Sequence, residues 1–93
     1  MATLSDADIE QRLAGAGAWR RDGQAIVREL QLADFAAAIA FVNRVAEVAE
    51  AANHHPDILV HGWNKVRLTL CTHSQGGLTD ADFALAREID RLA

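Results

Sequence analysis

The sequence predicts an α+β domain of two layers, in which helices pack on one face of a four-stranded antiparallel sheet. Helix signals occur at the start, in the middle and at the end of the chain, and two pairs of strand-like segments lie between them. Turn residues join the strands of each pair, which favours hairpins and therefore antiparallel pairing. The expected order is α-β-β-α-β-β-α, and the apolar faces of helices and strands must cover each other.

The first helix is expected to begin in the sequence LSDADI at residues 4–9. Ser5 is a typical N-cap, the aspartates after it favour the positive end of a helix, and Leu4 can pack against Ile9. The glycines of AGAG, residues 14–17, should end this helix. Two strands follow in AWRRDG and QAIVRELQL, and Asp22-Gly23 between them is a frequent hairpin dipeptide.

A long helix is expected from about Ala33 to about Asn53. Pro56 disfavours helical geometry at His55, so the helix should stop near Asn53 or His54. Apolar residues recur at helical spacing and form one continuous stripe: Phe35, Ala38, Ile39, Val42, Val45, Ala46 and Ala49.

The second pair of strands is expected in DILVHGW and NKVRLTLCT, joined through Gly62 and Asn64. Apolar and polar residues alternate in the second of these segments, as in a strand with one buried face. The loop HSQGG leads into LTDADF at residues 78–83, which repeats the first helix signal almost letter for letter. Thr79 should therefore cap a last helix that runs to the end of the chain.

Composition narrows the possible functions. The 93 residues, 51% of them hydrophobic, form one domain over residues 1–93 with a modest core. A net charge of −4 without a basic run gives no support for binding to nucleic acid or to an anionic membrane. Cys71, the single cysteine, cannot form an internal disulfide, which favours a reducing compartment. No secretory signal or membrane span is visible, so a cytoplasmic location is expected.

All four histidines lie between residues 54 and 73. His54 and His55 are neighbours whose side chains point in different directions, and Cys71 and His73 lack an obvious third ligand, so no metal site is expected. His61 lies in a strand-like segment beside a glycine and is expected to be structural. The other three lie at a helix exit or a strand end, where side chains that carry function are often found.

Acid–base chemistry is the alternative to an ordinary loop role for these histidines. Histidine titrates near neutral pH, so a pair can donate one proton and accept another. Glu50 lies four residues before His54, and its carboxylate could orient that imidazole and favour its protonated form; it could equally be a solvated helix residue. Spacing alone predicts a general acid–base site whose substrate is open.

A wider pattern runs through the chain. It comprises Glu50, His54-His55-Pro56 after three residues, an aromatic at Trp63, then Thr72-His73 and Asp82. Supporting features are Trp19, DF at 34–35, NKV at 64–66 and GL at 77–78. This pattern resembles the signature of the pterin-4a-carbinolamine dehydratase family over nearly the whole chain. The chain departs from it at Asn53, where an acidic residue is frequent, and after Pro56, where an aromatic residue is frequent.

The resemblance implies a hydro-lyase that dehydrates 4a-hydroxytetrahydropterin to quinonoid dihydropterin, in the recycling of tetrahydrobiopterin, without metal or organic cofactor. It implies that His54 and His73 are the main proton-transfer pair, that His55 binds the pterin or assists, and that Glu50 orients the site. Which histidine is acid and which is base stays open. Asp82 belongs to the signature as well, although helix capping explains it adequately, as for the equivalent Asp8.

The resemblance also implies partners. Members of the family are homo-oligomers, so a homodimer or homotetramer is expected, with a functional link to an aromatic amino-acid hydroxylase. The alternative is a non-catalytic binding or dimerisation module for a partner protein such as a transcription factor, because some family members stabilise the assembly of one. A stable protein partner together with no dehydratase activity would favour this alternative.

Overall fold

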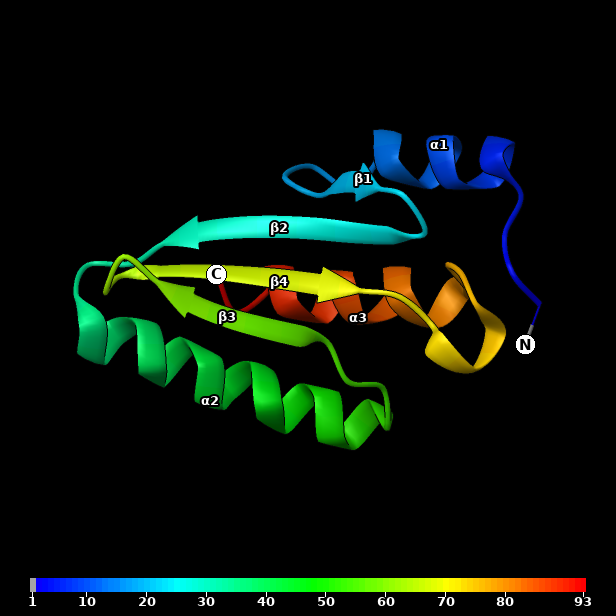
Figure 1. Cartoon of the computed structure of the whole chain (residues 1–93). Helices are drawn as coiled ribbons and strands as arrows, with labels where there is room; N and C mark the ends of the chain where they lie inside the picture. Colours follow the sequence, from blue (N-terminus) through cyan, green and yellow to red (C-terminus); the bar gives the residue numbers. More distant parts are fainter. Residues whose placement is uncertain (1) are drawn as a thin grey trace.

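The computed structural model describes residues 2–93. In chain order, the elements are α1 (Asp6–Ala14), β1 (Arg20–Asp22), β2 (Ala25–Gln31), α2 (Phe35–Ala52), β3 (Asp57–His61), β4 (Lys65–Leu70), a 3-10 turn η1 (His73–Gln75) and α3 (Asp80–Asp90). Figure 1 shows α2 and α3 lying along the sheet and α1 beside β1. The predicted order α-β-β-α-β-β-α is confirmed.

The four strands form one open antiparallel sheet in the order β1-β2-β4-β3. On one face, Val66, Leu68 and Leu70 of β4 are fully buried, and Ile26 of β2 lies opposite Leu70. On the other face, Arg67 is exposed. This one-sided burial places the hydrophobic core between the sheet and the helices, as the alternating pattern of β4 predicts.

The two similar hexads, LSDADI at residues 4–9 and LTDADF at residues 78–83, begin helices, as expected. Ser5 caps α1 by accepting a hydrogen bond from the Asp8 amide, and Thr79 caps α3 within a reciprocal capping box. The Leu4 amide donates to the Leu78 carbonyl at 2.8 Å, so the segments that precede α1 and α3 lie side by side.

The long helix starts later than expected and ends close to the predicted stop near Asn53. It begins at Phe35 and not at Ala33, because the Asp34 side chain accepts from the Ala37 amide and is the N-cap. It ends at Ala52, and Asn53 adopts a left-handed conformation with φ of 51°. A left-handed residue at this position is a frequent helix stop, and it turns the chain before Pro56 enforces an extended path.

The core face of α2 is also rotated from the expected stripe. Its buried residues are Ala38, Phe41, Val45 and Ala49. Phe35 and Ile39, which the stripe included, are exposed. The apolar surface of α2 is therefore wider than the sheet covers. Within residues 2–93, no helix is long and apolar enough to cross a membrane.

Candidate active site

Three segments that are distant in sequence meet around the first of the adjacent histidines. They are the exit of α2, the segment that leaves β4 and enters η1, and the first turn of α3. The left-handed turn at Asn53 directs His54 away from the axis of α2, and the His54 amide still donates to the Ala49 carbonyl. The fold therefore brings a histidine from the middle of the chain to the N-terminus of the last helix.

Asp82 lies at the centre of this meeting point and is fully buried. Its Oδ2 accepts hydrogen bonds from the Thr79 amide at 2.9 Å and from the Thr72 hydroxyl at 2.8 Å. Its Oδ1 lies 2.6 Å from Nε2 of His54. Capping of α3 thus uses one oxygen of the carboxylate, and the other oxygen remains to orient an imidazole.

His54 is the most enclosed of the three candidate histidines, with 15% of its side chain exposed. When its ring is protonated, its contact with Asp82 becomes an ion pair in which the carboxylate is shielded from water. The other oxygen of Asp82 holds Thr72, the residue directly before His73. Asp82 therefore connects His54 to the segment that carries His73.

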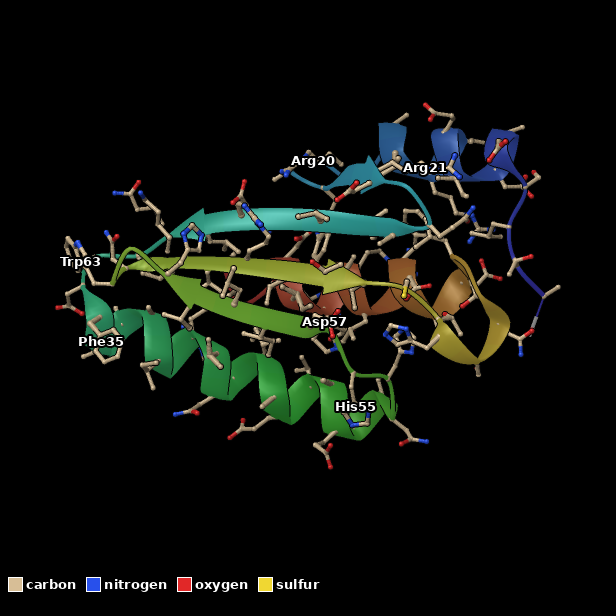
Figure 2. The ribbon with its side chains drawn as sticks, in the orientation of Figure 1. Arg20, Arg21, Phe35, His55, Asp57 and Trp63 are labelled. Carbon is tan, nitrogen blue, oxygen red and sulfur yellow. The ribbon has the colours of Figure 1, made fainter. Side chains whose placement is uncertain are left out.

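Glu50 contacts a different histidine from the one expected. Its Oε1 lies 2.6 Å from Nε2 of His55, and both side chains are exposed. The expectation that Glu50 lies beside His54 is wrong, because α2 ends at Ala52 and His54 no longer occupies the helical position four residues after Glu50. Figure 2 shows His55 at the exit of α2, near Asp57 at the start of β3.

His73 opens η1 with an exposed side chain. The sulfur of Cys71 lies 3.4 Å from its Nδ1 and 3.7 Å from its Nε2. Burial raises the pKa of the Cys71 thiol, and the negative charges of Asp82 and Asp57 raise it further. The thiol is therefore uncharged at neutral pH.

His61 lies at the opposite end of β3 from the adjacent histidines. Its Nε2 is buried and has no hydrogen-bond partner among residues 2–93, and Oε1 of Glu29 lies 3.9 Å away. A hydrogen bond from Arg67 and the charges of Arg67 and Arg20 lower the pKa of the Glu29 carboxyl. Among residues 2–93, no group of three or more His, Cys, Asp or Glu side chains is arranged to hold a metal ion.

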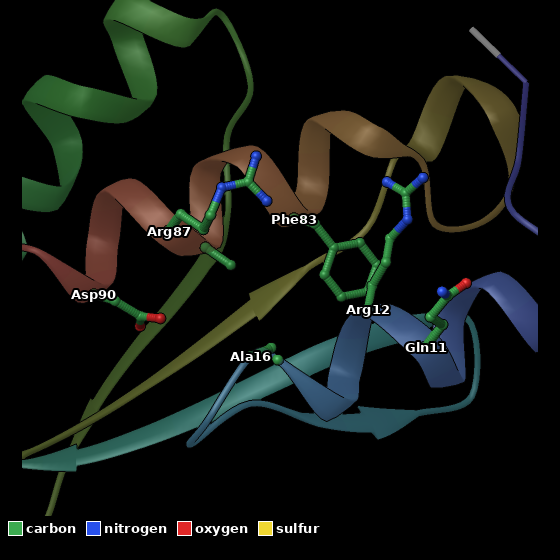
Figure 3. A pocket seen from close by; sticks show the side chains of 8 residues that line it. Gln11, Arg12, Ala16, Phe83, Arg87 and Asp90 are labelled. Carbon is green, nitrogen blue, oxygen red and sulfur yellow. The ribbon is translucent and has the colours of Figure 1, made fainter.

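Two hollows border the helix that carries Asp82. One, of about 370 Å³, lies between the exit of α2 and α3 and is lined by His54, Ala52, Leu85 and Arg87, among others. Another, of about 270 Å³, lies between α1 and α3, with Arg12 beside Phe83 (Figure 3). The second hollow contains none of the candidate histidines, so only the first gives access to His54.

Comparison with known proteins supports the pattern read from these residues. The family model described as pterin 4 alpha carbinolamine dehydratase matches residues 2–92. The chain belongs to this family. A relative from Roseiflexus sp. (strain RS-1), assigned by name to the pterin-4-alpha-carbinolamine dehydratases, is 55% identical over 93 residues and covers 99% of both chains. A relative from Nocardia farcinica with the same assignment is 53% identical over 90 residues, covering 97% of this chain and 94% of its own.

Solved structures of the carbinolamine dehydratase family share the fold. A transcriptional coactivator/pterin dehydratase from Brucella melitensis superposes with a TM-score of 0.92 at 31% identity, covering 98% of each chain. A pterin dehydratase-like protein described as a RuBisCO assembly factor of the alpha-carboxysome gives a TM-score of 0.68 at 28% identity, covering 82% of this chain and 89% of its own. The family resemblance read from the sequence is confirmed.

The geometry adds to the family signature two groups whose role the sequence did not indicate. Thr72 precedes His73 in the signature, and its hydroxyl bridges Asp82 and Thr79. Cys71 contacts the His73 ring. Strand alternation was the available signal, because continued past Leu70 it would place Cys71 and His73 on one face and Thr72 on the other.

Proposed function

We propose that the protein dehydrates a 4a-hydroxytetrahydropterin to the quinonoid dihydropterin by general acid–base catalysis. The C4a–O bond breaks as an acid delivers a proton to the departing hydroxyl, and a base removes the proton from N5. Water leaves and a C=N bond forms between C4a and N5, so atoms and electrons balance without an oxidant or a reductant. Two proton-transfer groups within reach of one substrate edge are sufficient for this reaction.

The observation that carries the proposal is the buried Asp82 carboxylate that holds His54 and, through Thr72, the segment of His73. We assign His54 and His73 to the two proton transfers. A carboxylate partner orients an imidazole and stabilises its charge, as the proton-transfer role of His54 requires. Asp82 thus acts by orienting His54 while it also caps α3.

His55 and Glu50 form the outer part of the proposed site. Both side chains are exposed and their contact is short, so together they present a polar pair to a ligand. We assign His55 to binding the pterin or to assisting in proton transfer, and Glu50 to orienting His55. This assignment replaces the expected contact between Glu50 and His54.

The test is a stopped-flow measurement of dehydration of a freshly generated 4a-hydroxytetrahydropterin by purified protein. General acid–base groups contribute about 10²–10⁴-fold to a rate, so His54→Ala and His73→Ala should each lower kcat by about 100-fold or more. His61→Ala is the matched control and should leave kcat unchanged. If the double variant His54→Ala/His73→Ala equals wild type, the assignment is wrong.

The proposed function extends to assembly and to metabolic context. Phe35 of α2 and Trp63 are exposed apolar side chains at the end of the molecule away from His55 (Figure 2), and Ile39, one helical turn after Phe35 on α2, is exposed as well. A surface with such side chains is suited to contact between subunits, so we propose a homodimer or homotetramer. We also propose that the protein acts in the cytoplasm, where this reaction would regenerate the pterin cofactor of an aromatic amino-acid hydroxylase.

A binding or assembly module is the second candidate. It is favoured by the printed descriptions of the two structural relatives, one as a transcriptional coactivator and one as a RuBisCO assembly factor. The same exposed surface around Phe35 would then bind a partner protein. A purified protein that forms a stable complex with such a partner and shows no dehydration above background would establish this alternative and exclude the enzyme.

A further inference from the structure

Three carboxylates lie beside the histidines of the proposed site, and two of them have partners. Oδ1 of Asp82 lies 2.6 Å from His54, and Oε1 of Glu50 lies 2.6 Å from His55. The third carboxylate belongs to Asp57, which is exposed and has no side-chain hydrogen bond or ion pair among residues 2–93. Asp57 is therefore the one carboxylate of the three that is free to bind a ligand.

The start of β3 places Asp57 beside the adjacent histidines. Asp57 follows His55 by two residues, and Figure 2 shows both side chains where the chain leaves α2 and enters β3. Across the sheet Asp57 lies opposite Thr69 of β4. Because Leu68 and Leu70 of β4 are buried in the core, Thr69 and Asp57 lie on the open face of the sheet, which the helices do not cover.

Asp57 is also close to the segment that carries His73. Burial raises the pKa of the Cys71 thiol, and the negative charges of Asp82 and Asp57 raise it further. The Cys71 sulfur in turn lies 3.4 Å from Nδ1 of His73. The free carboxylate is thus near the adjacent histidines on one side and near the His73 segment on the other.

The proposed substrate has an edge that matches a carboxylate. The pyrimidine ring of a pterin carries N3–H and the 2-amino group side by side, so this edge offers two parallel N–H donors, as a guanidinium does. A carboxylate accepts such a pair in bidentate geometry, and hydrogen bonds to an ionised acceptor are among the strong ones. C2 lies directly across the pyrimidine ring from C4a, so a group that holds this edge leaves C4a and N5 to the histidines.

We propose that Asp57 is a substrate-binding residue that accepts hydrogen bonds from N3–H and the 2-amino group of the pterin. The inference rests on the proposed function, which supplies the ligand. Asp82 and Glu50 could bind this edge only by giving up their contacts with His54 and His55. Asp57 therefore selects 2-amino-4-oxo pteridines and takes no part in proton transfer.

Two stable ligands test this recognition without catalysis. They are 7,8-dihydropterin and 7,8-dihydrolumazine, which carries a 2-oxo group in place of the 2-amino group. A hydrogen bond to a charged group contributes about 10- to 100-fold to an affinity, and the exposure of Asp57 favours the lower end. In isothermal titration calorimetry, wild type should therefore bind dihydropterin about tenfold more tightly than dihydrolumazine.

Replacement of Asp57 by asparagine should reverse this preference. The amide of Asp57→Asn can accept from N3–H and donate to the 2-oxo group, but it cannot accept from both donors of the pterin edge. Asp57→Ala should bind the two ligands about equally, because alanine matches neither edge. Asp8→Asn, the same change of charge at an exposed position of α1, is the matched control and should keep the wild-type preference.

Dehydration kinetics provide an independent measurement. Asp57→Asn should raise KM for the 4a-hydroxytetrahydropterin about tenfold and leave kcat within about twofold, because the residue holds the substrate and does not move its protons. A general loss of structure would instead weaken the binding of both ligands alike in both Asp57 variants. Circular dichroism melts of the variants detect such a loss directly.

The outcomes separate this inference from the proposed function. If wild type binds dihydropterin no more tightly than dihydrolumazine, or if Asp57→Asn keeps the wild-type preference, the inference is overturned; dehydration by wild type would leave the proposed function standing. If the preference reverses as expected but wild type shows no dehydration above background, the proposed reaction fails, and Asp57 remains the residue that recognises the pterin edge.

Discussion

Replacement of Asp82 by alanine should destabilise the fold far more than an aspartate substitution at the start of a helix usually does. The Asp82 carboxylate is fully buried and accepts from the Thr79 amide, from the Thr72 hydroxyl and from His54. In Asp82→Ala the Thr72 hydroxyl can still bond to Thr79 Oγ1, 2.8 Å away. The Thr79 amide loses its side-chain partner, and the largely enclosed His54 ring loses the only side-chain partner it has among residues 2–93.

The magnitude follows from these losses. A lost helix cap costs about 0.5–2 kcal/mol, and a buried polar group left without a partner costs about 1–3 kcal/mol. Because His54 can recover part of its loss from water, we expect Asp82→Ala to lower the free energy of unfolding by about 2–4 kcal/mol. For a domain of this size that corresponds to a fall in Tm of about 10–25 °C.

Urea titration and thermal melts followed by circular dichroism measure this loss. Asp8→Ala is the matched control, because Asp8 occupies the same place in the first hexad and its side chain is exposed. The control should lower the free energy of unfolding by less than about 1 kcal/mol, the contribution of an exposed acidic residue to the helix dipole. If both variants lowered the free energy of unfolding by the same amount, helix capping alone would explain the effect. The reasoning that the wider network around Asp82 stabilises this region would then be refuted.

Three further predictions follow from the same geometry. The pH midpoint for alkylation of Cys71 by iodoacetamide should lie above about 8.5, the ordinary pKa of a thiol, and Asp57→Asn should lower this midpoint. The thiol's contribution to the free energy of unfolding is present below the pKa of the unfolded chain and is lost as pH rises through the raised pKa of the folded protein. Glu50→Gln should change the free energy of unfolding by less than about 1 kcal/mol, because its contact with His55 is exposed, while pterin KM rises about two- to tenfold in steady-state assays. Phe35→Asp should reduce the mass measured by light scattering toward that of one chain, and an unchanged mass would exclude this surface from the subunit contact.

The architecture was predictable because local signals along the chain agree with one another. The caps at Ser5 and Thr79, the hairpin at Asp22-Gly23 and the alternation in β4 each depend on near neighbours in sequence, and each is confirmed. The exposed part of α2 was not predictable in this way. Helical periodicity shows that Phe35 and Ile39 lie on an apolar stripe, but only the position of the sheet shows that the fold leaves them uncovered.

The hydrogen-bond partners of the histidines could not be predicted from local sequence signals either. Spacing of four residues predicts a contact between Glu50 and His54 only while the helix continues, and α2 ends at Ala52. Once Asn53 takes a left-handed conformation, His55 is the ring that reaches Glu50, and His54 faces α3. The end of α2 lies within one residue of the predicted stop near Asn53, a difference inside the usual uncertainty of a helix boundary, yet the turn at Asn53 exchanges the partners of two adjacent histidines.

The repeated hexads explain why a residue that looks like a simple cap can belong to a site. LSDADI and LTDADF encode the same helix start, and both form it. Asp8 remains exposed because no distant segment covers it, whereas Asp82 is buried under the exit of α2 and the end of β4, which supply His54 and Thr72. A carboxylate has two oxygens, and a capping box uses one of them. The second oxygen acquires a role only through tertiary contact, so the functional difference between the two hexads lies in the fold and not in their letters.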